Sequence, residues 1–123
     1  DHASKSLVYS SAGHPAHHIR CSGEVYELEA TGIPLGVDLE TDWPESRSQP
    51  LEAGDMLLIM TDGLSEARSE SGEMFGTQRI LDFVHERRAD RASEIVDALC
   101  QQITDFAPKQ HDDITAILVK LRE

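Results

Sequence analysis

Two apolar runs that each meet an acidic segment constrain this chain more than any other feature. The run Met-Leu-Leu-Ile-Met at 56–60 ends in Thr-Asp-Gly at 61–63, and His-Asp-Asp at 111–113 directly precedes the apolar run 114–119. If the two runs are neighbouring antiparallel strands, the end of one lies beside the start of the other. Carboxylates that are far apart in sequence then meet at one rim of a sheet.

Such a meeting of carboxylates predicts a metal site, because like charges repel one another unless a cation lies between them. Hard divalent ions such as Mg²⁺ and Mn²⁺ prefer oxygen ligands. Gly63, directly after Asp62, permits a sharp turn and close approach of the backbone to a ligand or substrate. Taken alone, Asp62-Gly63 is also an ordinary turn, and Asp112-Asp113 is also an exposed loop or a cap. The two together favour metal-assisted hydrolysis.

Length and composition bound the class of protein. The 123 residues allow one domain, and 39% hydrophobic with 28% charged residues is typical of a soluble globular chain. No apolar stretch approaches the roughly 20 residues that span a bilayer, and no signal-like segment opens the chain, so we expect a cytoplasmic protein that does not enter a membrane. The net charge of -12 would repel a phosphate backbone, which argues against a nucleic-acid partner. Cys21 and Cys100 lack the spacing of a zinc site and are predicted to be small buried apolar residues.

Local patterns predict an α+β fold, with antiparallel β-sheets flanked by helices that pack across one sheet face. The run 56–60 is predicted to be a central strand buried on both faces. Thr77 is a possible N-cap of a first helix, and a second helix begins near Ser93 and ends at Pro108. Further strands are predicted at 7–10, 17–21, 25–30 and 114–121, with a shaped loop at 31–36 and at most an edge strand within 41–49.

The histidines admit more than one interpretation. His14 lies between Gly13 and Pro15, where it either binds substrate phosphate, orients a ligand, or only caps a hairpin. His17 and His18 do not share a face with it in an extended segment, so a zinc site is not favoured.

Five segments carry a resemblance to a known family. They are Ser-Ala-Gly-His-Pro at 11–15, Gly-Ile-Pro-Leu-Gly at 32–36, the stretch 54–68 that contains Thr-Asp-Gly, Phe-Gly at 75–76, and Asp-Asp-Ile-Thr at 112–115. In this order they resemble the C-terminal portion of the SpoIIE-type protein phosphatases. These form the branch of the metal-dependent PPM serine/threonine phosphatases that includes the sigma-B regulation phosphatases. The resemblance covers nearly the whole chain.

The resemblance implies part of a PPM-type α-β-β-α sandwich. It also implies two Mn²⁺ or Mg²⁺ ions bridged by a water or hydroxide that attacks phosphoserine or phosphothreonine in line. By this resemblance Asp62 and Asp112 are catalytic metal ligands, and Asp113 is the alternate to Asp112.

One departure from the family bears on activity. The family has an upstream acidic residue and an Asp-plus-glycine motif whose carboxylate bridges both metals, and nothing before Ser10 supplies it. We therefore expect residues 1–123 to be the C-terminal portion of the phosphatase domain, with the N-terminal part absent, to bind metal weakly and to be inactive alone. Uncovered sheet edges and apolar faces also predict a homo-oligomer.

Two functional hypotheses follow. The first is a phosphatase in the parent protein that acts on a phosphorylated regulatory protein, such as an anti-sigma-factor antagonist by family analogy. The alternative is a non-catalytic phosphatase-like interaction module. A metal- or nucleotide-binding sensor is disfavoured, because the chain has no glycine-rich phosphate loop.

Overall fold

The computed structural model describes residues 4–109 and 113–122 as two antiparallel sheets and three helices. The larger sheet has the strand order β3-β2-β5-β6, and the smaller one pairs β1 with β4. The strands are β1 (Ser6–Leu7), β2 (Ala16–Ile19), β3 (Val25–Leu28), β4 (Gln49–Pro50), β5 (Met56–Met60) and β6 (Ala116–Lys120). The helices are α1 (Asp62–Ser65), α2 (Thr77–Glu86) and α3 (Ala92–Phe106).

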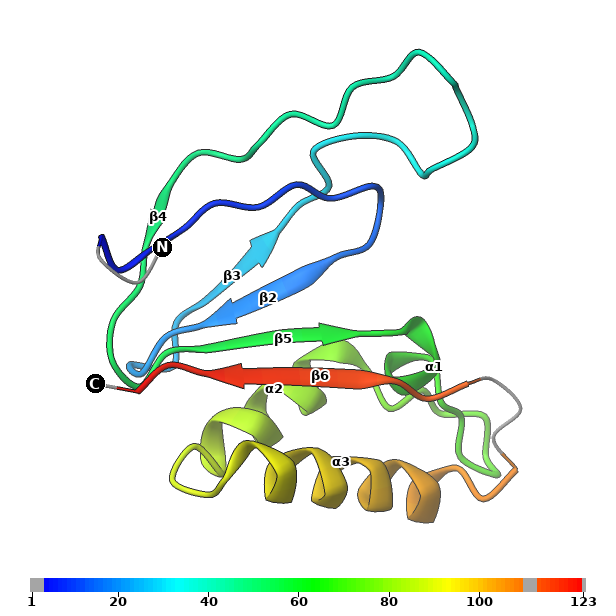
Figure 1. Cartoon of the computed structure of the whole chain (residues 1–123). Helices are drawn as coiled ribbons and strands as arrows, with labels where there is room; N and C mark the ends of the chain where they lie inside the picture. Colours follow the sequence, from blue (N-terminus) through cyan, green and yellow to red (C-terminus); the bar gives the residue numbers. More distant parts are fainter. Residues whose placement is uncertain (1–3, 110–112, 123) are drawn as a thin grey trace.

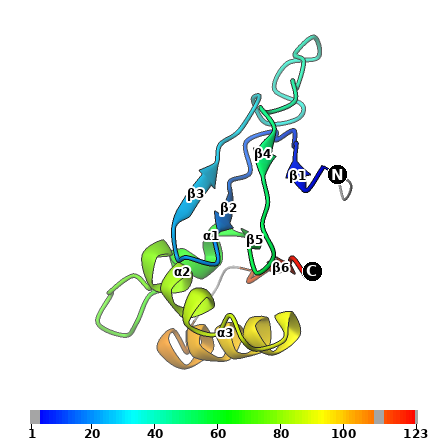
Figure 2. The same cartoon turned by 90° about the vertical axis from the view of Figure 1, so that its left-hand side faces the viewer.

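The elements are arranged in layers. Helices α2 and α3 cover one face of the four-stranded sheet, and the segments that contain β1 and β4 lie on its other side (Figures 1 and 2). Residues between β3 and β4 form a long loop that projects away from the sheet (Figure 1). The predicted α+β fold with antiparallel sheets and helices on one face is confirmed.

Strand β5 is the centre of the core. Its neighbours β2 and β6 align Ile19 with Met56 and Leu118 with Leu58. On this face Ile19, Met56 and Leu58 are buried in the core shared with the helices, and Leu118 packs against it partly buried. The prediction that β5 is buried on both faces is wrong, because Ile59 is 38% exposed. Its five residues are all apolar, but successive side chains point to opposite faces and the helices cover only one.

Helices α2 and α3 present regular apolar stripes to the sheet. Ile80 and Val84 of α2 and Ile95, Leu99 and Ile103 of α3 are buried in the common core. Helix α2 begins at Thr77 with Gly76 as its N-cap, one residue before the predicted cap. In the parts of the chain described here, none of the helices has the length and apolar character needed to cross a bilayer.

A buried carboxylate joins the β2–β3 hairpin to the turn before β5. Asp55 is fully buried and accepts hydrogen bonds from the His18 ring (2.8 Å) and from the backbone N–H groups of Cys21 and Glu52 (both 3.0 Å). Burial alone would raise the pKa of Asp55, but these three donors together hold its pKa below the usual value. Cys21 itself is exposed, which corrects its predicted burial, since the hairpin turn carries it to the surface.

Candidate active site

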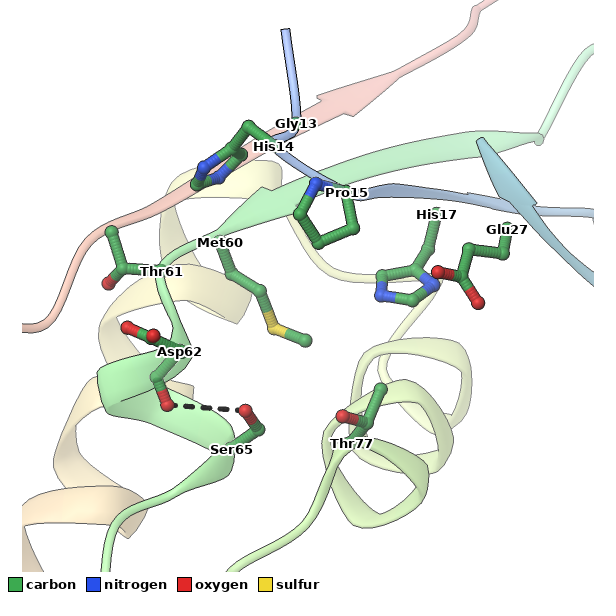
Figure 3. A pocket seen from close by; sticks show the side chains of 10 residues that line it. All are labelled: Gly13, His14, Pro15, His17, Glu27, Met60, Thr61, Asp62, Ser65 and Thr77. Carbon is green, nitrogen blue, oxygen red and sulfur yellow. Dashed lines mark hydrogen bonds between the residues drawn. The ribbon is translucent and has the colours of Figure 1, made fainter. Parts of the chain in front are cut away.

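The end of β5 opens into the pocket shown in Figure 3, with a volume of about 530 Å³. One wall is the segment 13–15, and another is the cross-strand pair His17 and Glu27 from β2 and β3. Residues 60–62 and the hydroxyl side chains of Ser65 and Thr77 complete the lining. Segments from both halves of the chain therefore converge on one cavity.

Asp62 lies where β5 gives way to α1. Thr61 keeps the extended backbone of the strand, and Asp62 begins the short helix with an exposed side chain at the pocket (Figure 3). Its backbone is fixed, because its carbonyl accepts hydrogen bonds from the Glu66 N–H (2.8 Å) and the Ser65 hydroxyl (3.2 Å). Leu64 is fully buried beneath this turn. The carboxylate is thus held at the cavity by a rigid turn.

Thr61 binds the end of β5 to the segment that leads into β6. Its backbone N–H donates to the Thr115 carbonyl (3.0 Å), its hydroxyl donates to the Asp113 carbonyl (3.1 Å), and the Thr115 N–H donates to the same hydroxyl (3.1 Å). These contacts, with the antiparallel pairing of β5 and β6, confirm that the end of one predicted strand lies beside the start of the other. Asp113 is exposed beside the site, whereas His111 and Asp112 lie outside the described residues, so the ligand roles of Asp62, Asp112 and Asp113 stay predictions.

The two residues predicted to contact substrate occupy different positions. His14 is exposed on the wall of the pocket, and the Ser11 hydroxyl donates to its carbonyl (2.8 Å), which fixes the local turn. Gly63 is buried in α1 and does not line the cavity. The substrate-binding role of each stays a prediction.

Sequence reasoning missed the wall formed by His17 and Glu27. The sequence predicts strands at 17–21 and 25–30, which contain these two residues, but it assigns no functional role to either. The two are directly paired across β2 and β3. His17 is 7% exposed, and burial lowers its pKa while the charge of Glu27 partly opposes the shift. The alternation of side chains along the two strands places His17 and Glu27 on one face of the sheet. Only the structure shows which face the helices cover and where they leave a pocket.

The donor chemistry of the site fits a hard divalent ion. Asp62 supplies carboxylate oxygens at the pocket, and Asp113 lies on the neighbouring segment. Within residues 4–109 and 113–122, no three side chains of His, Cys, Asp or Glu gather closely enough to form a metal cluster. The described residues therefore fit an ion held by one or two carboxylates, with water and phosphate oxygens as the remaining ligands.

Several known proteins are similar to this chain. Residues 1–122 match the model of the family described as Stage II sporulation protein E (SpoIIE). Phosphoserine phosphatase RsbU of Bacillus subtilis is 32% identical over 119 residues, which are 93% of this chain and 34% of that protein. The SiaA-PP2C domain of Pseudomonas aeruginosa superposes with a TM-score of 0.80 at 24% identity, over 98% of this chain and 48% of that one. The manganese-presoaked phosphatase domain of SpoIIE from Bacillus subtilis superposes with a TM-score of 0.70 at 22% identity. The superposition covers 99% of this chain and 53% of that one. The chain thus spans about a third of RsbU and half of these solved domains.

Proposed function

Because this chain belongs to the SpoIIE family, we propose that the protein that carries it hydrolyses phosphoserine or phosphothreonine with the help of divalent ions. The observation that carries this proposal is the Asp62 carboxylate, held at a pocket where Thr61 joins the ends of two strands. The similarity to phosphoserine phosphatase RsbU supports the reaction class. The family resemblance drawn from the motifs is confirmed by the match over residues 1–122.

In the complete domain, two Mn²⁺ or Mg²⁺ ions would supply the Lewis-acid chemistry that activates water and neutralises phosphate charge. The manganese presoak of a similar domain supports this ion class. Asp62 would hold one ion, together with Asp112 or Asp113 from the neighbouring segment. The His14 ring and the hydroxyl groups of Ser65 and Thr77 line the same pocket and are suited to bind phosphate oxygens.

The proposed substrate is a phosphorylated regulatory protein of a bacterium, such as an anti-sigma-factor antagonist. Residues 1–123 would form the C-terminal portion of the phosphatase domain and be inactive alone. The coverage of about half of the similar solved domains supports this division.

The test uses the complete protein with p-nitrophenyl phosphate and a phosphoserine peptide in the presence of Mn²⁺. We expect Asp62→Asn to lower kcat/KM by roughly 100-fold or more for both substrates, because it removes a charged metal ligand. Asp97→Asn is the matched control, since Asp97 is exposed on α3 and does not line the pocket. Activity that survives Asp62→Asn would refute the assigned role.

A non-catalytic interaction module is the second candidate, and one observation favours it. On the sheet face opposite the helices, Ile117 and Val119 are 52% and 47% exposed, a surface suited to a protein partner. If the complete protein neither binds Mn²⁺ nor hydrolyses phosphoserine, the interaction module is the better description.

A further inference from the structure

The pocket contains a second carboxylate that the proposed reaction does not use. Glu27 of β3 lies beside His17 on the wall across the cavity from Asp62 (Figure 3). The strand register places Glu27 opposite His17, and His17 opposite Leu58 of β5. Glu27 is therefore held by the sheet rather than by a loop.

Among the residues that the structure describes, no lysine or arginine balances the charge of Glu27. The lining of the pocket contains no lysine or arginine, and in the described parts of the chain neither residue type forms an ion pair with Glu27. Burial of the His17 ring lowers its pKa, so this neighbour is neutral near pH 7. The wall thus presents an exposed carboxylate next to a neutral imidazole.

The separation of the two carboxylates suits the spacing of residues in a bound peptide. Asp62 stands four positions beyond Leu58, just past the end of β5, which is at most ~13 Å along the strand direction, and β3 is two strands away, which is ~10 Å. The two components together give a separation of at most ~16 Å, or about five residues of a substrate that advances ~3.3 Å per residue, and the reach of the two bound side chains shortens this backbone span. A group bound at Glu27 would then lie about two to four residues from one bound at Asp62.

We propose that Glu27, together with His17, forms a subsite for a basic side chain of the substrate, two to four residues from the phosphorylated residue. The inference rests on the proposed function, since it places the phosphoryl group at Asp62. A guanidinium group pairs with a carboxylate through two parallel hydrogen bonds, and its flat face packs well against an aromatic ring. Glu27 selects the substrate, and His17 shapes the surface on which the basic group lies.

The experiment compares phosphoserine peptides that carry Arg, Ala or Glu at positions two to four residues from the phosphoserine, on the complete protein with Mn²⁺. We expect kcat/KM for the best Arg peptide to exceed that for its Ala counterpart by about three- to fivefold, the range of a partly exposed ion pair. Glu27→Gln removes this preference, and Glu27→Arg transfers it to the Glu peptide. Turnover of p-nitrophenyl phosphate, which is too small to reach Glu27, stays unchanged in both variants.

Glu29→Gln is the matched control, because Glu29 is exposed just past the end of β3 and does not line the pocket. It should keep the preference for arginine. Equal turnover of the Arg and Ala peptides by the unaltered protein would overturn the inference, as would a parallel loss of p-nitrophenyl phosphate activity in Glu27→Gln.

Fluorescence anisotropy of the same labelled peptides separates this inference from the proposed function. If no peptide is hydrolysed, arginine-dependent binding that Glu27→Gln abolishes still supports the subsite, and equal binding of all three peptides overturns it.

Discussion

Asp55 concentrates three hydrogen bonds on one fully buried carboxylate, and each of its partners is a donor. An amide at this position would direct an NH₂ group toward one of those donors. We therefore expect Asp55→Asn to lower the free energy of unfolding by about 2–3 kcal/mol at pH 7. Urea unfolding measures the difference, with Asp97→Asn on the exposed face of α3 as the control.

The same variant has a defined pH signature. Because the pKa of Asp55 is lower in the folded than in the unfolded protein, the unfolded chain takes up the proton first as the solution is acidified. The stabilisation is complete above the unfolded pKa of about 4 and is lost as the pH falls through the folded value. The difference in the free energy of unfolding between the unaltered protein and Asp55→Asn should accordingly become smaller below pH ~4. A difference that does not change with pH would contradict this explanation.

Thr61 is a positioning residue for the proposed metal site. Its hydroxyl holds the Asp113 carbonyl and the Thr115 N–H at once, both at 3.1 Å. We expect Thr61→Val to weaken Mn²⁺ binding to the complete protein by about tenfold in calorimetry, because the neighbouring segment is released. Thr61→Ser should restore the affinity.

Thr104→Val is the matched control, since this exposed hydroxyl of α3 bonds only the Cys100 carbonyl (2.9 Å) in the described residues. A Thr61→Val protein that is less stable but binds Mn²⁺ with unchanged affinity would assign Thr61 a purely structural role.

At the scale of elements, the start of α2 depends on a backbone conformation that favours glycine. Gly76 is the N-cap with φ 87° and ψ 146°, and this cap makes no side-chain hydrogen bond to the helix. A Cβ at Gly76 would meet no atom within 4 Å, so substitution there adds backbone strain and no clash. We expect Gly76→Ala to cost about 1–3 kcal/mol in thermal unfolding, whereas Thr77→Ala costs less than about 0.5. If Thr77→Ala lowered the stability more than Gly76→Ala, Thr77 would be the capping residue.

The elements that could be predicted from the sequence are those in which a periodic apolar pattern continues over many residues, or those that a clear turn separates. Helix α3 repeats apolar residues at Ile95, Leu99 and Ile103, and the strands predicted at 17–21 and 25–30 overlap β2 and β3. Helix α1 was missed, because four residues beginning at Asp62 are too few to show a helical period. Strands β1 and β4 are only two residues each and are defined by their pairing rather than by their composition.

One part of the candidate site could likewise be predicted from the sequence, and another part could not. The meeting of Asp62 with the segment after Asp112 could be predicted, because antiparallel pairing of two apolar runs fixes which ends are neighbours. The wall of His17 and Glu27 could not, because it requires the register of β2 against both β3 and β5. The packing of helices that are distant in sequence decides where on the sheet a cavity forms.

At the scale of the whole molecule, the described residues cover the sheet face opposite the helices only in part, on the side where the segments that contain β1 and β4 lie (Figure 2). The side chains of Ile59, Ile117 and Val119 point away from the helices and are 38%, 52% and 47% exposed. Strand β6 is also an edge strand in the sheet formed by the described residues, and such edges tend to pair with other chains. An apolar face beside an open edge favours association.

We therefore expect the 123-residue chain to form homo-oligomers through this face and edge, with a mass by light scattering that rises with concentration. The double variant Ile117→Lys and Val119→Lys should shift the mass toward the monomer, because two charges would be buried on association. Met74→Lys is the control, since Met74 is similarly exposed, at 42%, but lies in an isolated bridge with Arg68, apart from the sheet. A monomeric mass for the unaltered chain at high concentration would show that this face needs no second copy.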